Sequence, residues 1–149
     1  MTKYLLDTNI VSYLEDETSP FHQSVRKRLS QLSNVSKVYV SLLTLFEIHY
    51  GIAYLGKDKA NNLLSMKNSI KDNFVILYLT DKNAEIFGTL KSLYRKKTGI
   101  GKKEIEQHNI DFMIASTAIS ENAVLVSNDS IFTHIKNLQN DLQLENWAG

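Results

Sequence analysis

Short apolar, β-rich runs alternate along this 149-residue chain with longer segments of helical period. This alternation is typical of a parallel sheet covered by helices, and it argues against a β-sandwich or a helical bundle. The runs are brief and strongly apolar, as buried parallel strands are. A sheet of four or five strands is therefore expected, with strands at residues 4–6, 37–40, 75–79, 124–127 and 142–144. Helices are expected at residues 9–15, 20–32, 42–55, 57–72, 81–97 and 110–121.

Start signals mark several of these helices. Ser41, Thr80 and Asn109 each precede a predicted helix, and their side chains can accept a hydrogen bond from an otherwise unpaired helix N–H. Pro20 falls where the first turn of a helix tolerates proline. Residues 98–108 are rich in Gly, Lys and Glu, so a loop is expected there, between a basic helix and an apolar one.

Size and composition limit the class of protein. A chain of 149 residues suits one domain, and 43% hydrophobic with 22% charged residues argues against disorder and against a membrane protein. A carboxylate at residue 7 interrupts the first apolar run before it reaches the length of a signal peptide, so a cytoplasmic location is the default expectation. There is no Cys, which excludes disulfides, thiol nucleophiles and zinc–thiolate sites. A metal ion would have to be held by oxygen or imidazole ligands.

Two acids follow predicted strands. Asp7 comes directly after the first strand, and Asp129 comes shortly after the fourth. Open α/β sheets bind ligands at the carboxyl ends of their strands, so both carboxylates would reach one edge if these strands are neighbours. Taken singly, each acid is more simply explained as a turn or helix-capping residue.

Two further acids lie near the starts of predicted helices. Glu47 interrupts a largely apolar stretch, so it belongs either at the surface edge of its helix or against a partner. Asp111 falls in a first helical turn, where the helix dipole stabilises an acid by about 0.3 to 1 kcal/mol. The joint placement of all four acids nevertheless favours a shared site. Carboxylates share a small site when a cation neutralises them, and all-oxygen ligation favours Mg²⁺ or Mn²⁺ over zinc.

The small net charge hides an uneven distribution. Between Lys82 and Lys103 there are seven Lys and Arg residues and one Glu, a local charge of +6 that leaves −5 for the rest of a chain whose total is +1. Such a segment can dock a phosphate backbone, or it can be a solvated helix end whose cations complement the helix dipole. The candidates for RNA contact are Arg95, Lys96, Lys97, Lys102 and Lys103.

The aromatic residues and histidines carry weaker signals. Tyr and Phe residues lie mostly at core-like spacings, so none is assigned to base stacking. The histidines show no metal-binding spacing; they are His22, His49, His108 and His134.

Four short motifs together resemble the PIN-domain ribonucleases, and within them the VapC-type toxins of bacterial type II toxin–antitoxin pairs. The motifs are Asp7-Thr8-Asn9, Glu47-Ile48-His49-Tyr50-Gly51, Asp111-Phe112-Met113-Ile114-Ala115 and Ser127-Asn128-Asp129. Their acids are separated by 40, 64 and 18 residues, and the order matters more than any single motif. The ending from Leu142 to Trp147 is also similar, so the resemblance spans nearly the whole chain.

The resemblance implies a fold, a site and an activity. The fold would be a three-layer α/β/α domain with strand order 3-2-1-4-5. An acidic cluster would surround Mg²⁺ or Mn²⁺ and hydrolyse RNA phosphodiesters, and the chain would form a homodimer inhibited by an antitoxin whose C-terminal segment covers the site. The acids carried over are Asp7, Glu47, Asp111 and Asp129, with polar support from Thr8, Asn9 and Ser127. The alternative is a non-catalytic PIN-fold module that binds RNA or protein and uses the acids as structural caps.

Overall fold

A parallel five-stranded sheet forms the centre of the computed structural model, which describes all 149 residues. The strand order is β3-β2-β1-β4-β5, and every neighbouring pair is parallel. The fold class and this order are confirmed, and each predicted strand is present within one or two residues of its expected bounds. The strands are β1 (Lys3–Leu6), β2 (Lys37–Ser41), β3 (Val75–Leu77), β4 (Val124–Val126) and β5 (Gln143–Glu145).

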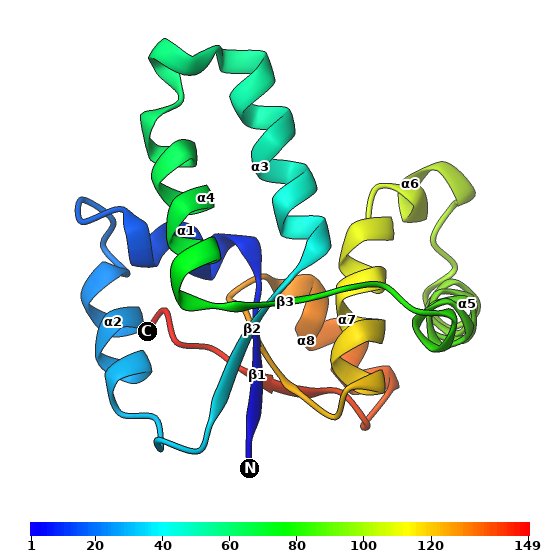
Figure 1. Ribbon diagram of the computed structural model, residues 1–149. Helices are drawn as coiled ribbons and strands as arrows, with labels where there is room; N and C mark the ends of the chain where they lie inside the picture. The colour runs from blue at the N-terminus through cyan, green and yellow to red at the C-terminus, as the bar shows by residue number, and fades with distance from the viewer.

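Helices cover both faces of the sheet, which gives three layers (Figure 1). One face carries α1, α2 and α4, and the other carries α5, α7 and α8. The long α3 and the antiparallel α4 form a hairpin that projects past the edge of the sheet (Figure 1). The helices are α1 (Thr8–Glu15), α2 (His22–Ser30), α3 (Leu42–Leu55), the 3₁₀ turn η1 (Lys57–Lys59), α4 (Asn61–Asn73), α5 (Asp81–Thr98), α6 (Lys102–Glu106), α7 (Asn109–Ser120) and α8 (Ser130–Leu138). None of these helices has the length and apolar character needed to cross a membrane.

Two apolar cores, one on each face of the sheet, hold these layers together. Alternation along β1 divides its residues between them: Leu5 packs into the cluster under α5, α7 and α8, whereas Tyr4 and Leu6 pack into the cluster under α1, α2 and α4. Phe112 and Phe132 anchor α7 and α8 in the first cluster with no exposed surface. Because β1 and β4 lie in the middle of the sheet, the residues that follow them are held on a rigid base.

Two of the three predicted helix caps are confirmed. The Ser41 hydroxyl accepts a hydrogen bond from the Leu43 N–H at 3.1 Å. Thr80 forms a reciprocal capping box with Asn83 at the start of α5. The prediction for Asn109 is wrong, because Asn109 is already the first residue of α7 and His108 occupies the cap position without a side-chain bond.

The predicted loop at residues 98–108 is also wrong, since it contains the short helix α6. Gly99 ends α5 in the left-handed conformation, with φ of 71°, and the chain then turns into α6. Ile105, 1% exposed, fastens α6 to the core beneath α5 and α7. One apolar residue among charged ones gives no helical period, so α6 cannot be predicted from hydrophobic periodicity.

Two predicted helices have different bounds in the structure, and one further helix was not predicted. The predicted helix at residues 57–72 is divided into η1 and α4, because Gly56 ends α3 with φ of 81° and the next turn is 3₁₀. The helix expected at residues 20–32 starts at His22, after Pro20. The predicted helices also leave out α8, which places Ile131, Phe132 and Ile135 on its buried face.

Candidate active site

Asp7 occupies the centre of the candidate site, at the carboxyl end of β1. Its backbone N–H continues the sheet by donating to the Val126 carbonyl at 2.9 Å, and its side chain is 7% exposed. One carboxylate oxygen, Oδ1, accepts from the Thr8 N–H at 2.9 Å and so caps α1. The other, Oδ2, accepts from the Ser127 hydroxyl at 2.9 Å. Both oxygens are thus fixed by donors from the two central strand ends.

Burial gives Asp7 an unusual proton affinity. The pKa of this carboxyl is raised to about 6, above all because burial disfavours the charged form, and the negative charges of Asp111 and Glu47 add to the rise. The bonds from Ser127 and the Thr8 N–H oppose the rise without cancelling it. Buried carboxyls with shifted pKa values cluster at functional sites, because catalysis requires pKa values matched to the reaction.

Glu47 reaches the same place from α3. Its Oε1 accepts from the Thr8 hydroxyl at 2.9 Å, which ties α3 to the first turn of α1. The Thr8 hydroxyl also lies 2.9 Å from the Thr44 hydroxyl. Since Thr8 gives its only hydroxyl proton to Glu47, Thr44 donates to Thr8. Glu47 was expected either at the surface edge of its helix or against a partner. Both descriptions apply, because Glu47 is exposed and accepts a bond from Thr8.

Ser127 connects Asp7 with Asp129. Its hydroxyl donates to Asp7 and accepts from the Asp129 N–H at 3.0 Å. The Asp129 carboxylate is exposed and caps α8 by accepting from the Ile131 N–H at 3.2 Å. Asp129 therefore caps a helix and also lies near Asp7, because α8 begins close to the carboxyl end of β4.

Asp111 approaches from the first turn of α7. It is half-buried, and its Oδ2 lies 3.3 Å from Nδ1 of His108. Burial raises the pKa of Asp111, the hydrogen bond with His108 lowers it, and the charge of Asp129 raises it further. Asp111 thus feels the charge of Asp129, and Asp7 feels the charges of Asp111 and Glu47, so the four carboxylates share one electrostatic environment.

The donor chemistry of the site fits a hard divalent cation. All four acids supply oxygen, the chain has no Cys, and the mutual repulsion of the carboxylates favours a neutralising ion. No three of the Asp, Glu and His side chains converge closely enough here to enclose a metal ion. Instead each carboxylate points to a protein donor, which for Glu47 is Thr8 and for Asp111 is His108.

Of the three polar residues predicted to support the acids, two contact a carboxylate and one does not. Two further residues with contacts at the site were not predicted. Thr8 and Ser127 hold carboxylates as described, whereas Asn9 is exposed in the first turn of α1. The prediction did not include Thr44 and His108, which contact Thr8 and Asp111. The helical spacing of three residues between His108 and Asp111, and between Thr44 and Glu47, is the signal that the sequence offers.

The predicted basic residues lie on α5 and α6, in two groups. Arg95, Lys96 and Lys102 line a groove between these helices. Lys91 also lines this groove, where it pairs with Glu106 at 3.0 Å. The remaining predicted residues, Lys97 and Lys103, are exposed beside the groove without lining it.

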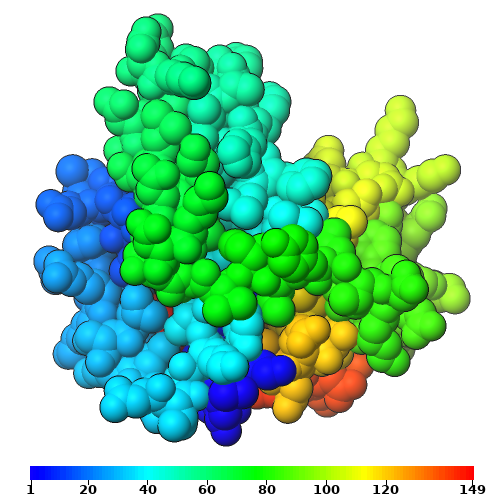
Figure 2. Space-filling model, in the orientation of Figure 1, coloured from blue at the N-terminus to red at the C-terminus, as the bar shows by residue number.

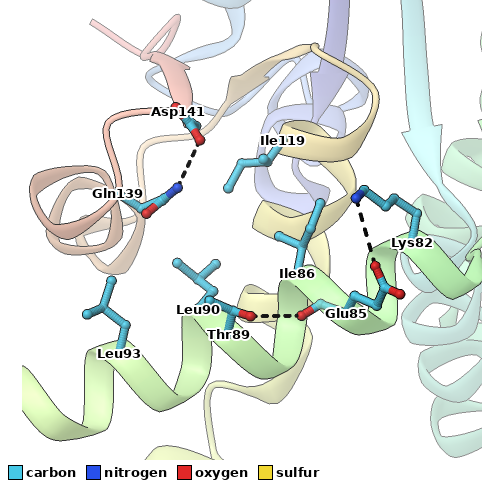
Figure 3. Close-up of a pocket in the computed structure, with 9 residues that line it drawn as sticks. All are labelled: Lys82, Glu85, Ile86, Thr89, Leu90, Leu93, Ile119, Gln139 and Asp141. Atoms are coloured by element: carbon cyan, nitrogen blue, oxygen red, sulfur yellow. Dashed lines mark hydrogen bonds and ion pairs between the residues drawn. The ribbon is translucent and has the colours of Figure 1, made fainter.

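A second groove lies on another face of α5 and contains none of the four acids (Figure 3). Ile86, Leu90 and Leu93 of α5 line it opposite Ile119 and the segment after α8. Lys82 and Glu85 pair across one helical turn at 3.8 Å. Its lining mixes apolar side chains with polar and charged ones, and the four acids at the strand ends lie outside it.

Comparison with known proteins shows which family this fold belongs to. The PIN domain family model matches residues 4–138. Ribonuclease VapC2 from Rickettsia felis is 31% identical over 144 residues, which cover 97% of both chains. Ribonuclease VapC2 from Haemophilus influenzae is 32% identical over 130 residues, covering 87% of this chain and 88% of the relative. The chain therefore belongs to the PIN domain family and, within it, to the VapC type.

A solved structure extends the similarity to three dimensions. A chain in the crystal structure of VapBC2 from Rickettsia felis bound to a DNA fragment from their promoter matches with a TM-score of 0.74 and 30% identity. The match covers 98% of this chain and 99% of that one. The similarity thus extends over nearly the whole length of both chains.

Proposed function

We propose that this chain is an endoribonuclease that hydrolyses RNA phosphodiesters and acts as the toxin of a toxin–antitoxin pair. The observation that carries the proposal is the buried Asp7 carboxylate, which faces the charges of Glu47 and Asp111 at the end of a central strand. Such a group disfavours folding in its ionised form, so a functional role explains its retention. The VapC relatives, which are named ribonucleases, supply the reaction class.

The chemistry assigned to the site is hydrolysis. Asp7, Glu47, Asp111 and Asp129 would hold Mg²⁺ or Mn²⁺, which when bound lowers the pKa of water and neutralises charge on the phosphoryl group. Water attacks phosphorus, the bond from phosphorus to the 3′ oxygen breaks, and the 3′ oxygen takes up a proton. The products carry a 5′-phosphate and a 3′-hydroxyl.

Hydroxyl groups of the chain keep the carboxylates in place for this step. Ser127 orients Asp7, and Thr8 orients Glu47 through a bond that Thr44 supports. A carboxylate of the site that is not bound to the cation could assist by accepting a proton from the attacking water.

The basic groove supplies binding for the RNA backbone in this proposal. Arg95, Lys96 and Lys102 line the groove, and Lys97 and Lys103 extend the positive surface beside it. Phosphate contacts of this kind offset the repulsion between RNA and the four acids. Complementing the dipole of α5 remains the alternative role for the cations in its last turn.

The proposal includes two protein partners and a location. The related structure is a VapBC complex, which supports a cognate antitoxin as a partner. The family resemblance implies that the C-terminal segment of this antitoxin covers the acidic site. The family resemblance supports a homodimer, which sedimentation of the purified chain would test. An RNA substrate implies the cytoplasm as the place of action.

A second candidate is a non-catalytic PIN-fold module that binds RNA or protein. Its supporting observation is that Asp7 caps α1 and Asp129 caps α8, so both acids also have structural roles. In such a module neutral Asn would serve nearly as well as Asp, because Asn is an equally good cap. The two candidates therefore differ in what Asp7→Asn removes: RNA cleavage in the first, and neither cleavage nor RNA binding in the second.

Cleavage of labelled RNA by the purified chain decides between them. We expect cleavage in Mg²⁺, none in excess chelator, and recovery on adding Mn²⁺. Asp7→Asn should abolish cleavage, whereas Asp72→Asn, at an exposed position on α4, should leave it unchanged. RNA binding without cleavage by the unmodified chain would favour the second candidate, and product ends with cyclic phosphate would contradict the hydrolytic route.

A further inference from the structure

One histidine, His108, lies against the acidic site without a part in the chemistry described so far. Its Nδ1 is 3.3 Å from Oδ2 of Asp111, which follows three residues later at the start of α7. The two side chains are 34% and 26% exposed, so the pair lies at the half-buried edge of the site. Among the four histidines of the chain, His108 alone contacts one of the four acids.

The bond from His108 occupies one oxygen of Asp111 and leaves the other free. An ionised carboxylate only accepts hydrogen bonds, so the proton between the two residues is on Nδ1 of His108. No group of the chain donates to Oδ1 of Asp111. Asp7 differs, since Thr8 and Ser127 bond both of its oxygens. Asp111 is therefore fixed at one oxygen and open at the other.

The imidazole of His108 is carried by a rigid junction between α6 and α7. The His108 N–H donates to the Ile105 carbonyl at 3.0 Å, and the His108 carbonyl accepts from the Phe112 N–H at 2.9 Å. Ile105 and Phe112 are buried in the same core. Glu106 fastens α6 further by pairing with Lys91 of α5 at 3.0 Å. A side chain on such a base can hold a carboxylate in one orientation.

This junction borders the place where the acids meet solvent. Figure 2 shows the surface hollowed between the α3–α4 hairpin and the yellow region where α6 meets α7. From these two sides, α3 supplies Glu47 and α7 supplies Asp111, and Asp7 feels the charge of both. The pair of His108 and Asp111 thus lies on one side of the position where a cation would be held.

A purely structural explanation for the His108 side chain has little support. His108 occupies the cap position of α7, but its side chain makes no capping bond. The ring belongs to neither apolar core. Ser, Thr, Asp or Asn would cap the helix better than His. The contact with Asp111 is the one bond that the ring makes within the chain.

We propose that His108 is a positioning residue, which fixes the Asp111 carboxylate for a divalent cation through the hydrogen bond from Nδ1. The proposal rests on the proposed function and deepens it, because it adds a residue that acts through a metal ligand. Carboxylates that bind metal ions are themselves held by hydrogen bonds from neighbouring groups. Loss of such a neighbour weakens metal binding or activity about 10–100-fold.

Binding of Mn²⁺ alone to the purified full chain tests this role, measured as the loss of the EPR signal of free Mn²⁺. His108→Phe keeps a ring and removes the donor, so Mn²⁺ affinity should fall about tenfold or more. His108→Asn places an amide N–H near the position of Nδ1 and should keep an affinity close to the parent's. His134→Phe removes an imidazole at an exposed position on α8 and should change nothing.

Thermal unfolding distinguishes positioning from a structural role. Mn²⁺ stabilises the folded chain more when it binds more tightly. The rise in Tm on adding Mn²⁺ should therefore be smaller for His108→Phe than for the parent, and normal for His108→Asn. A structural role would instead lower Tm in chelator and leave the rise with Mn²⁺ unchanged.

Three results would overturn the proposal. The first is parental Mn²⁺ affinity, or a parental rise in Tm, in His108→Phe. The second is a parent chain that binds no Mn²⁺. The third is a nitrogen coupling on bound Mn²⁺ that is absent in His108→Asn, because His108 would then be a ligand itself.

RNA cleavage separates this role from the proposed function. We expect His108→Phe to need more Mn²⁺ for half-maximal cleavage, while its rate at saturating Mn²⁺ stays close to the parent's. If the parent cleaves RNA and His108→Phe needs no more Mn²⁺, the role of His108 is wrong and the proposed function stands. If Mn²⁺ binding depends on His108 and the parent cuts no RNA, the role stands and the proposed function is wrong.

Discussion

The Asp7 carboxylate illustrates how one residue serves the fold and the site together. It caps α1 and accepts a bond from Ser127, which are ordinary structural roles. Yet its pKa of about 6 means that its ionised form is disfavoured in the folded protein. The Asp7 side chain therefore stabilises the fold as a helix cap and destabilises it as a buried negative charge. A bound cation or a proton would neutralise that charge.

This balance predicts how stability depends on pH in metal-free buffer. Because the pKa of Asp7 is near 3.8 when unfolded and about 6 when folded, the folded state binds the proton more tightly. The free energy of unfolding should therefore fall as pH rises from about 4 to 6, by about 3 kcal/mol at 1.36 kcal/mol per pKa unit. In the Asp7→Asn variant, the free energy of unfolding should not show this decrease of about 3 kcal/mol.

Urea unfolding with chelator at pH 4, 5, 6 and 7 measures the difference. Asp72→Asn, at an exposed site, is the control and should keep the parent profile. The raised pKa of Asp111 leaves a smaller fall of the same sign in the Asp7 variant. Identical profiles for the parent and Asp7→Asn would show that Asp7 does not titrate in this range.

At the residue scale, the sequence predicts which acids follow strands but not what they contact. Asp7 and Asp129 come together because β1 and β4 are neighbours, which strand order alone decides. The contacts of Thr44 and His108 depend on how α3 and α7 cross the sheet, and this crossing geometry cannot be predicted from a single sequence. The roles of the four acids stay predictions until variants are assayed.

At the scale of elements, Asp129 allows charge and capping to be separated. Asp129→Asn removes the charge and keeps a side chain that can accept the Ile131 N–H bond, so stability should change by less than about 0.5 kcal/mol. Asp129→Ala removes both and should cost about 1 kcal/mol. RNA cleavage should fall in both variants. If only the Ala variant loses cleavage, Asp129 acts as a cap and not as a charged member of the site.

Two glycines of α5 predict opposite effects of the same substitution. Gly99 ends the helix with φ of 71°, so Gly99→Ala should destabilise the protein by about 1 kcal/mol. Gly88 lies inside the helix with open space where a Cβ would stand, so Gly88→Ala should stabilise by about 0.5–1 kcal/mol. Thermal unfolding of both variants measures the signs. A Gly99→Ala variant that is as stable as the parent, or more stable, would mean that the turn into α6 does not require the left-handed conformation.

The two helices absent from the sequence prediction, α6 and α8, are short and differ in the signal they carry. In α6 only Ile105 is apolar, so no period exists to detect. In α8 a period is present in Ile131, Phe132 and Ile135, and the Asp129 cap precedes it. A capping residue before an apolar period is a helix start signal, so the sequence does contain enough information to predict α8.

At the scale of the whole molecule, the parallel sheet follows from the alternation of strands and helices. The strand order comes from the family resemblance, because many orders satisfy the same alternation. The exposure of Phe46, Tyr50 and Tyr54 is not predictable from the sequence, since spacing identifies one side of α3 but not whether a neighbour covers it. The projection of the α3–α4 hairpin leaves that side open (Figure 1).

The uneven charge of the molecule predicts the salt dependence of RNA binding. Each phosphate contact to a single strand contributes about 0.7 to the slope of log affinity against log salt. Replacing both Arg95 and Lys96 with Ala should therefore reduce that slope by about 1.4, if both groove residues contact phosphates. Replacing Arg26 and Lys27, an exposed pair on α2, makes the same change in net charge and should leave the slope unchanged. Fluorescence anisotropy across a salt series, with Asp7→Asn to prevent cleavage, gives both slopes. If the two pairs reduce the slope equally, net charge rather than the groove attracts RNA, and if neither does, the cations of α5 only complement its dipole.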